Sequence, residues 1–288
     1  MSSGTSETLP QGTKSNGNRR QREPVSRSVR ISKLLSKLLR HQAESEGLSI
    51  DSEGFIKLSD VMKHKYLKSV KATYDEVFEI VNNNDKKRFK IIKKSGDNND
   101  DDDDECTQFS PQFSEYYYIS ALQGHSINKI EKTFNMVEFT NDDVDFPKEI
   151  IHGTSKKNLE LILKSGGLSK MKRNHIHFTS GIPEWLIELR RKARPSSNSE
   201  DNNNSQTDND NKDGEKIISG MRKTCNVLIY LDVEKIKDSE KEENNGDQLK
   251  FFKSDNGVIL SPGDANGFIN KKYFKKITDQ YGTEITGI

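Results

Sequence analysis

The first third of the chain carries apolar residues at the spacing of amphipathic helices. Leucine and isoleucine recur at i, i+3, i+4, i+7 and i+8 over residues 31–39, which predicts a helix that ends at Arg40 and His41. A second, shorter helix is predicted over residues 59–67. A third begins at Thr73, because a glutamate three residues later completes the pattern of a capping box.

Two strand-like runs follow these helices, at residues 88–92 and 116–122. Three helices followed by a hairpin is the element order of a winged-helix module. Residues 28–130 are therefore predicted to form one lobe of this kind.

The pattern changes from about residue 144. Residues 149–151 are predicted to form a strand that is followed directly by His152, Gly153 and Thr154. Ser155 can then cap a helix, which the glycines at 166 and 167 close. Further strands are predicted at residues 175–178, 227–233, 257–260 and 268–277. Residues 144–288 are therefore predicted to form a mixed α+β lobe that consists largely of strands.

Three polar segments explain an unusual composition. Hydrophobic residues make up 31% of the chain and charged residues 32%. Even with the 19 glycines added, the apolar fraction falls short of the roughly 45–50% of globular domains. The deficit lies in residues 1–27, which we expect to be a disordered basic arm, and in low-complexity inserts at 95–114 and 195–214. The acidic insert at 95–114 is expected to be a solvated excursion, because closing a longer loop costs little.

Charge and cysteine content narrow the class of protein. The formal net charge of +1 hides a basic N-terminal part and an acidic block at residues 100–105. Cys106 and Cys225 are the only cysteines, too few for a disulfide framework or a cysteine quartet. No apolar stretch is long enough to cross a bilayer, and the N-terminus lacks the apolar core of a signal peptide. We expect an intracellular monomer, located in the cytoplasm, the nucleus or both, with no membrane partner.

Several basic residues have an ordinary structural explanation when each is taken alone. A helix C-terminus favours cations such as Arg40 and His41 through the macrodipole, by roughly 0.3–1 kcal/mol. Arg88 stands on a basic strand edge, which discourages edge-to-edge pairing. Arg173 can be explained as an ordinary charged residue in a surface loop.

Histidines gather in the strand-like segments of the second lobe, at His152, His175 and His177. A His-x-His pair permits zinc, but no cysteine or paired carboxylate stands at ligand spacing nearby, so no metal site is predicted. The alternative for His175 or His177 is a ring that packs inward and hydrogen-bonds the backbone. The glycine-rich phosphate loops GxGxxG and GxxxxGK[ST] are absent from the sequence, which leaves kinase and Rossmann functions without support.

Six segments, taken in order, resemble the Tpt1/KptA family of tRNA 2'-phosphotransferases. They are residues 34–41 (LLSKLLRH), 84–89 (NDKKRF), 123–126 (QGHS), 151–154 (IHGT), 167–178 (GLSKMKRNHIHF) and 218–222 (ISGMR). The resemblance runs from about Ile31 to the C-terminus and is interrupted by the two inserts and a divergent end. No single segment decides it, but their common order across both lobes makes coincidence a poor explanation.

The resemblance implies a winged-helix RNA-binding lobe followed by an NAD-binding lobe of the ADP-ribosyltransferase type. The family removes the internal 2'-phosphate that splicing leaves in tRNA, with NAD as co-substrate and without a metal. The RNA 2'-phosphate first attacks C1'' of the nicotinamide ribose and expels nicotinamide. The 2''-hydroxyl then attacks phosphorus, which frees the RNA 2'-hydroxyl and yields ADP-ribose 1'',2''-cyclic phosphate.

The family's essential residues, an Arg-His pair and two further arginines, match Arg40, His41, Arg88 and Arg173 of this chain. Planar guanidinium groups that are always charged suit a phosphate dianion and the charge that gathers on phosphorus in the second step. Histidine can donate to a phosphate oxygen or to the departing oxygen. The resemblance further implies contacts to NAD from His152, Gly153, Thr154, His177, Ser219, Gly220 and Arg222.

Two other functions are compatible with the same residues. An ADP-ribosyltransferase that acts on nucleic-acid ends or on protein would keep the NAD chemistry and change the acceptor. A non-enzymatic RNA-binding winged-helix protein would have a second lobe that no longer binds NAD. The presence of all four basic residues favours the two-step phosphotransferase reaction.

Overall fold

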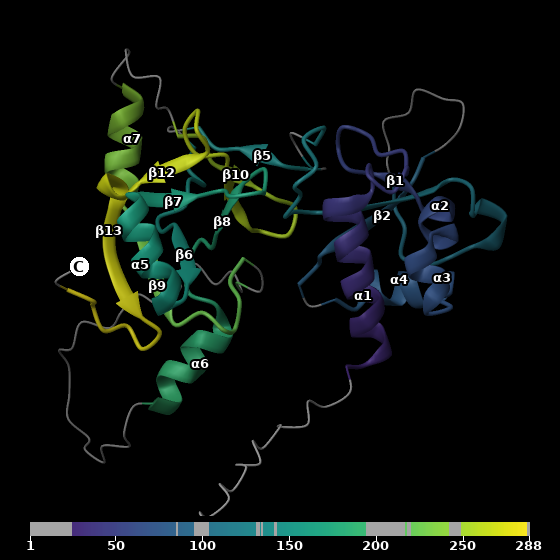
Figure 1. The fold of residues 1–288 in the computed structure, drawn as a ribbon, viewed down its shortest axis with the longest axis horizontal. Coiled ribbons are helices and arrows are strands. Elements are labelled where there is room, and N and C mark those ends of the chain that lie inside the picture. The colour runs from purple at the N-terminus through teal and green to yellow at the C-terminus, as the bar shows by residue number, and fades with distance from the viewer. Residues whose placement is uncertain are drawn as a thin grey trace, which may run out of the picture.

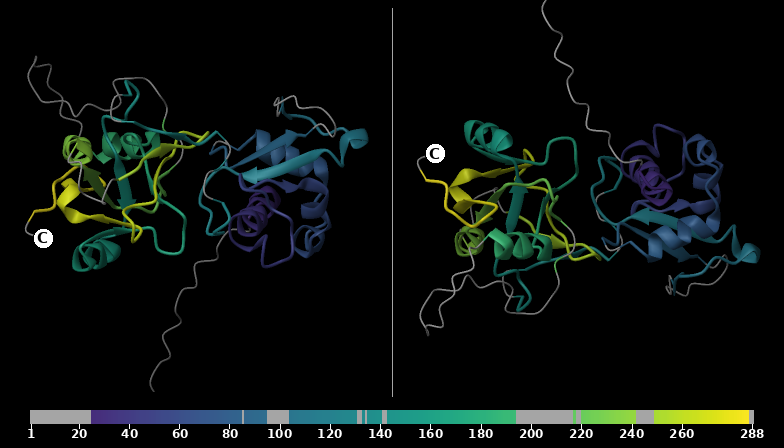
Figure 2. Two further views of the ribbon diagram at one scale, coloured as in Figure 1. Left: turned by 90° about the horizontal axis from the view of Figure 1, so that it is seen from above. Right: turned by 90° about the horizontal axis from the view of Figure 1, so that it is seen from below.

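The computed structural model describes most of the chain as two lobes, which lie side by side in all three views (Figures 1 and 2). Each lobe mixes helices with antiparallel strands, which confirms the predicted α+β class. The described residues are 25–84, 86–94, 104–130, 133, 135–140, 143–193, 217, 220–241 and 249–286. Most of the predicted arm (1–24), the first half of the acidic insert (95–103) and the insert at 195–214 lie outside them.

The first predicted helix is confirmed and extends further in both directions. Helix α1 spans Arg27–Lys37, and the π-helical turn η1, Leu38–Gln42, continues it through Arg40 and His41. At its start the Ser26 hydroxyl accepts the N–H of Val29, as expected of a serine N-cap. The predicted apolar stripe is the buried face of this helix.

The second predicted helix is two helices, α2 (Leu58–Lys63) and α3 (Lys65–Ser69). His64 between them has an extended backbone, and its Nδ1 accepts the N–H of Tyr66 to cap α3. The prediction of one helix was wrong because histidine is not among the usual capping residues, so the sequence carries no clear stop signal there.

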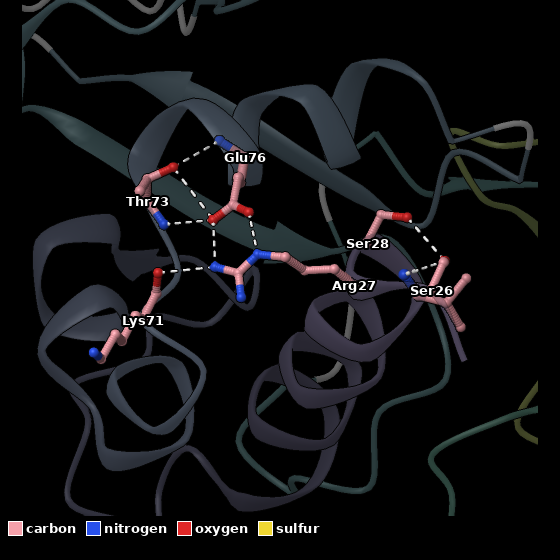
Figure 3. Close-up of polar contacts among 7 residues, drawn as sticks. Ser26, Arg27, Ser28, Lys71, Thr73 and Glu76 are labelled. Carbon is pink, nitrogen blue, oxygen red and sulfur yellow. Dashed lines mark hydrogen bonds and ion pairs between the residues drawn. The ribbon is translucent and has the colours of Figure 1, made fainter. Parts of the chain in front are cut away.

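Helix α4 spans Tyr74–Asn82 and begins with the predicted capping box (Figure 3). The Thr73 hydroxyl accepts the N–H of Glu76 at 3.3 Å, and the Glu76 carboxylate accepts the N–H of Thr73 at 3.0 Å. The same carboxylate pairs with the Arg27 guanidinium, which also donates to the carbonyl of Lys71. The capping box therefore joins the start of α4 to the start of α1.

A four-stranded antiparallel sheet of order β1-β4-β2-β3 completes the first lobe. Strands β2 (Phe89–Lys93) and β4 (Tyr117–Ala121) pair from Phe89↔Ala121 to Lys93↔Tyr117, which confirms the predicted hairpin. Short strands β1 (Ile56–Lys57) and β3 (Asp104–Glu105) pair with β4 and β2. One continuous apolar core lies between this sheet and the helices.

The described part of the acidic insert packs on this core. Strand β3 pairs with β2, and the 3-10 turn η2 spans Pro111–Phe113. Phe109 stacks on Tyr74 with ring centroids 4.5 Å apart, and Phe109 and Phe113 contact the core. The prediction of a solvated excursion was therefore wrong for residues 104–114, because aromatic residues in this segment supply apolar area that outweighs its polar composition.

The second lobe contains two antiparallel sheets and a strand pair. One sheet has the order β13-β9-β6, with β13 Phe274–Asp279, β9 Val227–Leu231 and β6 Ile151–Thr154. The other has the order β5-β10-β11-β8, with β5 Val137–Glu138, β10 Phe252–Lys253, β11 Ile259–Ser261 and β8 Ile176–Phe178. Strand β7 (Gly167–Ser169) pairs with β12 (Phe268–Asn270). A bridge between Ile151 and Thr179 links the two sheets beside β6 and β8.

Some elements of the second lobe differ from those predicted. His152, Gly153 and Thr154 lie inside β6 and do not follow it. The predicted last strand is two strands, β12 and β13, separated by the 3-10 turn η3 (Lys271–Tyr273) that the Asn270 side chain caps. Helix α5 (Lys156–Ser165) is as predicted, from its Ser155 cap to left-handed Gly166.

Two helices of this lobe were not predicted. Helix α6 spans Glu184–Ala193 and buries Leu186 against Ile151 and Leu228. Helix α7 spans Val233–Lys241 and contributes Ile236 to the main core of the lobe. The lobe is therefore richer in helix than its pattern of strands suggested.

Two asparagines of the second lobe bind backbone of the first. The Asn174 N–H donates to the His125 carbonyl at 2.9 Å, and its side chain donates to the carbonyls of Ile127 and Ile130. The Asn256 side chain donates to the carbonyls of Lys86 and Lys87. These contacts fix the segments around Arg88 and Arg173 relative to one another.

Candidate functional site

Arg40 and His41 lie in the π-helical turn η1, directly after two buried leucines. Single π-helical turns are rare and occur preferentially at functional sites. The leucines hold the turn in the core, while the Arg40 side chain is half-buried and His41 is exposed. This turn therefore presents two basic side chains from a rigid position.

The turn at residues 123–126 supports this pair. The Ser126 N–H donates to the Arg40 carbonyl at 2.9 Å, and the Ser126 hydroxyl lies 2.9 Å from Nδ1 of His41. Gly124 has a φ of +86°, and a Cβ atom there would lie 3.4 Å from Nη1 of Arg40. The QGHS segment resembles the family in sequence, and its composition by itself is that of an ordinary turn. Its contact with Arg40 and His41 links residues 85 positions apart, which no local pattern indicates.

Arg88 stands immediately before β2, where its carbonyl accepts the N–H of Leu122 at 3.0 Å. Its guanidinium donates to Oδ1 of Asn84 at 3.0 Å. Partial burial lowers the pKa of Arg88. The side chain is thus held at one nitrogen by its own lobe.

Arg173 comes from the second lobe, in the loop between β7 and β8. Its N–H donates to the Lys170 carbonyl at 3.1 Å, and the neighbouring Asn174 ties the loop to the first lobe. The residue is exposed, yet the surrounding protein and then the charge of Arg222 lower the pKa of Arg173. A ligand in solution can therefore reach this cation.

Arg40, Arg88 and Arg173 lie close enough together to interact electrostatically. Burial first, then the charges of Arg88 and Arg173, lower the pKa of Arg40 to about 10. Nε and Nη2 of Arg40 are buried and have no hydrogen-bond partner. Buried charges without partners are costly, and each of the stated influences on Arg40 disfavours its charge. The arrangement is typical of a site that binds an anion.

Four histidines, two from each lobe, interact electrostatically with Arg40 or Arg173. Burial, Arg40 and Arg173, in that order, lower the pKa of His41, so its ring is mainly neutral at pH 7. Burial and then the charges of Arg40 and His41 lower the pKa of His125 to about 3. Burial lowers the pKa of His152 and the pKa of His177, and the charge of Arg173 contributes to both shifts. The predicted histidines and arginines of the two lobes therefore share one electrostatic neighbourhood.

His152 and His177 are joined directly. Nδ1 of His152 lies 2.9 Å from the carbonyl oxygen of His177, so Nδ1 carries the proton and donates it. The Nε2 atom of His152 is then left as an acceptor. Nε2 of His177 is buried without a hydrogen-bond partner. Orphaned buried polar atoms of this kind are uncommon in folded proteins and fit a ligand that completes the site.

The remaining predicted residues lie where protein packing constrains them. A Cβ atom on Gly153 would lie 2.4 Å from Cγ of Met221, and Thr154 is buried with its carbonyl bound to the N–H of Asn226. Gly220 has a φ of +97° and faces the Phe178 carbonyl. Ser219 lies outside the described residues. The segment at 220–221 thus packs on β6 and β8.

Comparison with known proteins gives the family. The profile of the "RNA 2'-phosphotransferase, Tpt1 / KptA family" matches residues 26–263. The chain belongs to this family. The matched span includes every candidate site residue from Arg40 to Arg222, as well as Ser126 and Asn256.

Curated relatives agree with the family profile. The chain is 34% identical to "tRNA 2'-phosphotransferase 1" of Danio rerio over 94% of this chain and 92% of the relative. It is 32% identical to "tRNA 2'-phosphotransferase" of Saccharomyces cerevisiae over 82% and 79%. The corresponding figures for "tRNA 2'-phosphotransferase 1" of Homo sapiens are 29% over 90% and 81%.

Within the described ranges, no group of three or more histidine, cysteine or acidic residues is placed to hold a metal ion. Among the described residues, no helix is long and apolar enough to cross a membrane.

Proposed function

We propose that this protein transfers the internal 2'-phosphate of spliced tRNA to NAD. The products are nicotinamide, ADP-ribose 1'',2''-cyclic phosphate and RNA with a free 2'-hydroxyl. The observation that carries the proposal is the gathering of Arg40, Arg88 and Arg173 from two lobes, with two buried nitrogens of Arg40 left without partners. Membership of the family and the names of the relatives support the same reaction.

The phosphate dianion is the ligand that the arginines suit best. Arg40 and Arg88 offer donors from the first lobe, and Arg173 adds donors from the second. Guanidinium groups bind phosphate oxygens in pairs, and charge-assisted bonds of this kind are about twice as strong as neutral ones. The same donors stabilise the charge that develops on phosphorus when the ester bond to the RNA breaks.

His41 adds a donor or acceptor of different character. Because its Nδ1 faces the Ser126 hydroxyl, Nε2 is the atom left to face the RNA. A neutral ring at pH 7 can accept a proton or pass one on, whereas an arginine cannot. We assign His41 to the oxygen that leaves phosphorus and becomes the RNA 2'-hydroxyl.

NAD is the co-substrate that the second lobe would hold. When bound, it supplies the electrophilic ribose carbon and nicotinamide as the leaving group. We propose that His152 and His177 contact it through their Nε2 atoms, of which that of His177 is buried without a partner. We assign Arg222 to the same anionic ligands as Arg173, whose pKa its charge lowers. We propose backbone contacts to NAD for Gly153 and Thr154, which follow His152 in β6, and for Gly220, which packs beside β8. For Ser219, only the family resemblance supports a contact to NAD.

The two lobes divide the substrates between them in this proposal. We propose that residues 28–130 form a winged-helix lobe that binds RNA, and that residues 144–288 form an ADP-ribosyltransferase-like lobe that binds NAD. The order of helices followed by the β2–β4 hairpin supports the first assignment. Support for the second comes from His152 and His177, which a hydrogen bond joins where β6 and β8, strands of two different sheets, meet.

The direct test uses RNA with one internal 2'-phosphate, incubated with NAD and the full chain. We expect loss of the phosphate, release of nicotinamide and formation of the cyclic phosphate. Arg88→Ala and Arg173→Ala should each lower the rate at least 100-fold without unfolding the chain, since removing one donor to a developing charge costs roughly 10²–10³ in rate. Arg191→Ala, which removes an exposed arginine of α6, is the matched control and should behave as the wild type.

The other outcomes identify the competing functions. ADP-ribosylated RNA or protein that accumulates and is not processed would indicate an ADP-ribosyltransferase. RNA binding without any heat of NAD binding in calorimetry would indicate a non-enzymatic RNA-binding protein. Near-normal turnover in Arg88→Ala or Arg173→Ala would contradict the assignment of that residue.

A further inference from the structure

The turn between β10 and β11 reaches from the second lobe to the first. The Asn256 side-chain amide donates to the carbonyl of Lys86 at 3.1 Å and to that of Lys87 at 2.9 Å. Asp255 of the same turn has its carboxylate 3.7 Å from the Lys90 ammonium group in β2. Both carbonyls that Asn256 binds belong to the segment directly before Arg88. None of the six segments that resemble the family contains this turn.

The turn is built to aim the amide of Asn256 at the other lobe. The buried Ser254 hydroxyl donates to Oδ1 of Asn256 at 2.8 Å, so the amide hydrogens are left to point outward. Ser254 and Val258 close the turn through backbone and side-chain hydrogen bonds of 3.0–3.1 Å. Gly257 takes a φ of +75°, which the turn requires. The asparagine is therefore oriented before it meets the first lobe.

The segment that receives these bonds is strained. Lys87 has a φ of 38°, in the left-handed region, which disfavours any residue with a Cβ atom. Such conformations persist only where surrounding contacts hold them. Asn84 holds the segment from within: its carbonyl accepts the N–H of Lys87, and its Oδ1 accepts both the N–H of Lys86 and the Arg88 guanidinium. Asn256 holds it from outside, at the carbonyls of Lys86 and Lys87.

We propose that Asn256 is a positioning residue that fixes the direction of the Arg88 side chain. By binding the two carbonyls before Arg88, it keeps Asn84 and the Arg88 guanidinium in a fixed position relative to the second lobe. Arg88 and Arg173 are then held at one spacing, and the 2'-phosphate meets both at once. This inference rests on the proposed function for its catalytic consequence, but the clamp itself is a property of the fold.

The first experiment tests the clamp without any reaction. Amide hydrogen exchange is measured for residues 86–94 in the wild type, in Asn256→Ala and in Asn256→Asp, which keeps the size but removes the donors. We expect exchange in this segment to become at least tenfold faster in both variants. The matched control is Asn266→Ala, an exposed asparagine in another turn of the same lobe, and it should leave the segment unchanged. Unchanged exchange in both Asn256 variants would overturn the clamp.

The second experiment separates positioning from general destabilisation. Affinity is measured in the absence of NAD for RNA with and without the internal 2'-phosphate, and the ratio reports the grip on the phosphate. Asn256→Ala should reduce this ratio toward that of Arg88→Ala, and the double variant should bind no more weakly than Arg88→Ala alone. If the double variant loses affinity by the product of the two single losses, Asn256 does not act through Arg88, and the proposal is overturned.

Turnover then links the clamp to the reaction. We expect Asn256→Ala to lower the rate of phosphate removal roughly 10–100-fold, as for a misplaced catalytic group, while the KM for NAD stays the same. A raised KM for NAD with an unchanged rate would overturn the assignment. A wild-type protein that removes no phosphate would refute the proposed function and not the clamp, which the exchange measurement decides by itself.

Discussion

Nδ1 of His41 lies 2.9 Å from the hydroxyl oxygen of Ser126, and the Ser126 N–H donates to the carbonyl of Arg40. One serine therefore holds both members of the Arg-His pair, by backbone and by side chain. A partner at Nδ1 fixes the orientation of the imidazole and decides which nitrogen remains for the substrate. Ser126 is thus a positioning residue for His41 in the proposed reaction.

Replacing Ser126 by alanine should slow phosphate removal about fivefold, because one hydrogen bond of about 1 kcal/mol is lost and the ring can turn. Ser126→Thr keeps the hydroxyl and should restore most of the rate. Single-turnover assays with saturating NAD measure the effect. Ser165→Ala, an exposed serine on α5, serves as control. Full activity in Ser126→Ala would mean that the contact has no part in orienting His41.

The unpaired nitrogens of Arg40 predict stabilisation by simple anions. Phosphate or sulfate that binds the native site alone raises the free energy of unfolding by RT ln(1 + [L]/Kd), about 1.4 kcal/mol at ten times Kd. Thermal unfolding in phosphate and in chloride at equal ionic strength should show a higher Tm in phosphate. Arg173→Ala should remove most of this difference, and Arg191→Ala should keep it. Equal responses of the two variants would place the anion elsewhere.

Two histidines whose pKa values are lowered by the fold, buried His125 and half-buried His175, predict a loss of stability in acid. Burial lowers the pKa of His125 to about 3 and the pKa of His175 to about 4, from a usual 6.5. Below pH 6.5 these two rings bind protons in the unfolded chain but stay neutral in the folded chain. The stabilisation is therefore complete above pH 6.5 and decreases as the pH falls toward 3 and 4, by up to about 1.4 kcal/mol per pH unit for each ring.

Urea unfolding between pH 7.5 and 5 measures this slope. His125→Gln keeps a polar side chain that does not titrate, so its free energy of unfolding should fall less steeply with acid than that of the wild type. The difference in the change across this range should be about 2 kcal/mol, from 1.5 pH units below 6.5. Parallel curves for the two proteins would show that His125 is not held neutral by the fold.

The sequence predicted well those features that rest on local signals. The periodicity of residues 31–39, the Thr73 capping box and the paired strands β2 and β4 all appear in the structure. The break at His64 escaped prediction because a histidine side chain replaces the usual cap. The packing of Phe109 was missed because acidic neighbours dominate the composition around it.

For the candidate site too, some residues could be predicted from the sequence and others could not. Family resemblance selected Arg40, Arg88 and Arg173, and the structure places them in one electrostatic neighbourhood. Their supports were not found, because Ser126 and Asn256 act through contacts that join distant parts of the chain. Such contacts depend on how two lobes pack, and neither periodicity nor a local motif carries that information.

The crowding at Gly220 makes the packing of the 220–221 segment testable. Its φ of +97° disfavours any side chain, and a Cβ atom would lie 2.8 Å from the Phe178 carbonyl oxygen and 2.7 Å from Cγ2 of Thr179. Gly47 has a similar φ of +77° but no atom within 4 Å of a Cβ position. Comparing alanine substitutions at Gly220 and Gly47 therefore separates the cost of backbone strain from the cost of steric overlap.

Gly47→Ala should lower the free energy of unfolding by about 1–2 kcal/mol, the cost of a left-handed alanine. Gly220→Ala carries that cost plus an overpacking term of about 1–3 kcal/mol, since the Phe178 backbone cannot move without disturbing β8. Because β8 carries His177, Gly220→Ala should also raise the KM for NAD, whereas Gly47→Ala should not. Urea unfolding and steady-state kinetics measure both effects. Equal destabilisation of the two variants would show that the 220–221 segment does not press on β8.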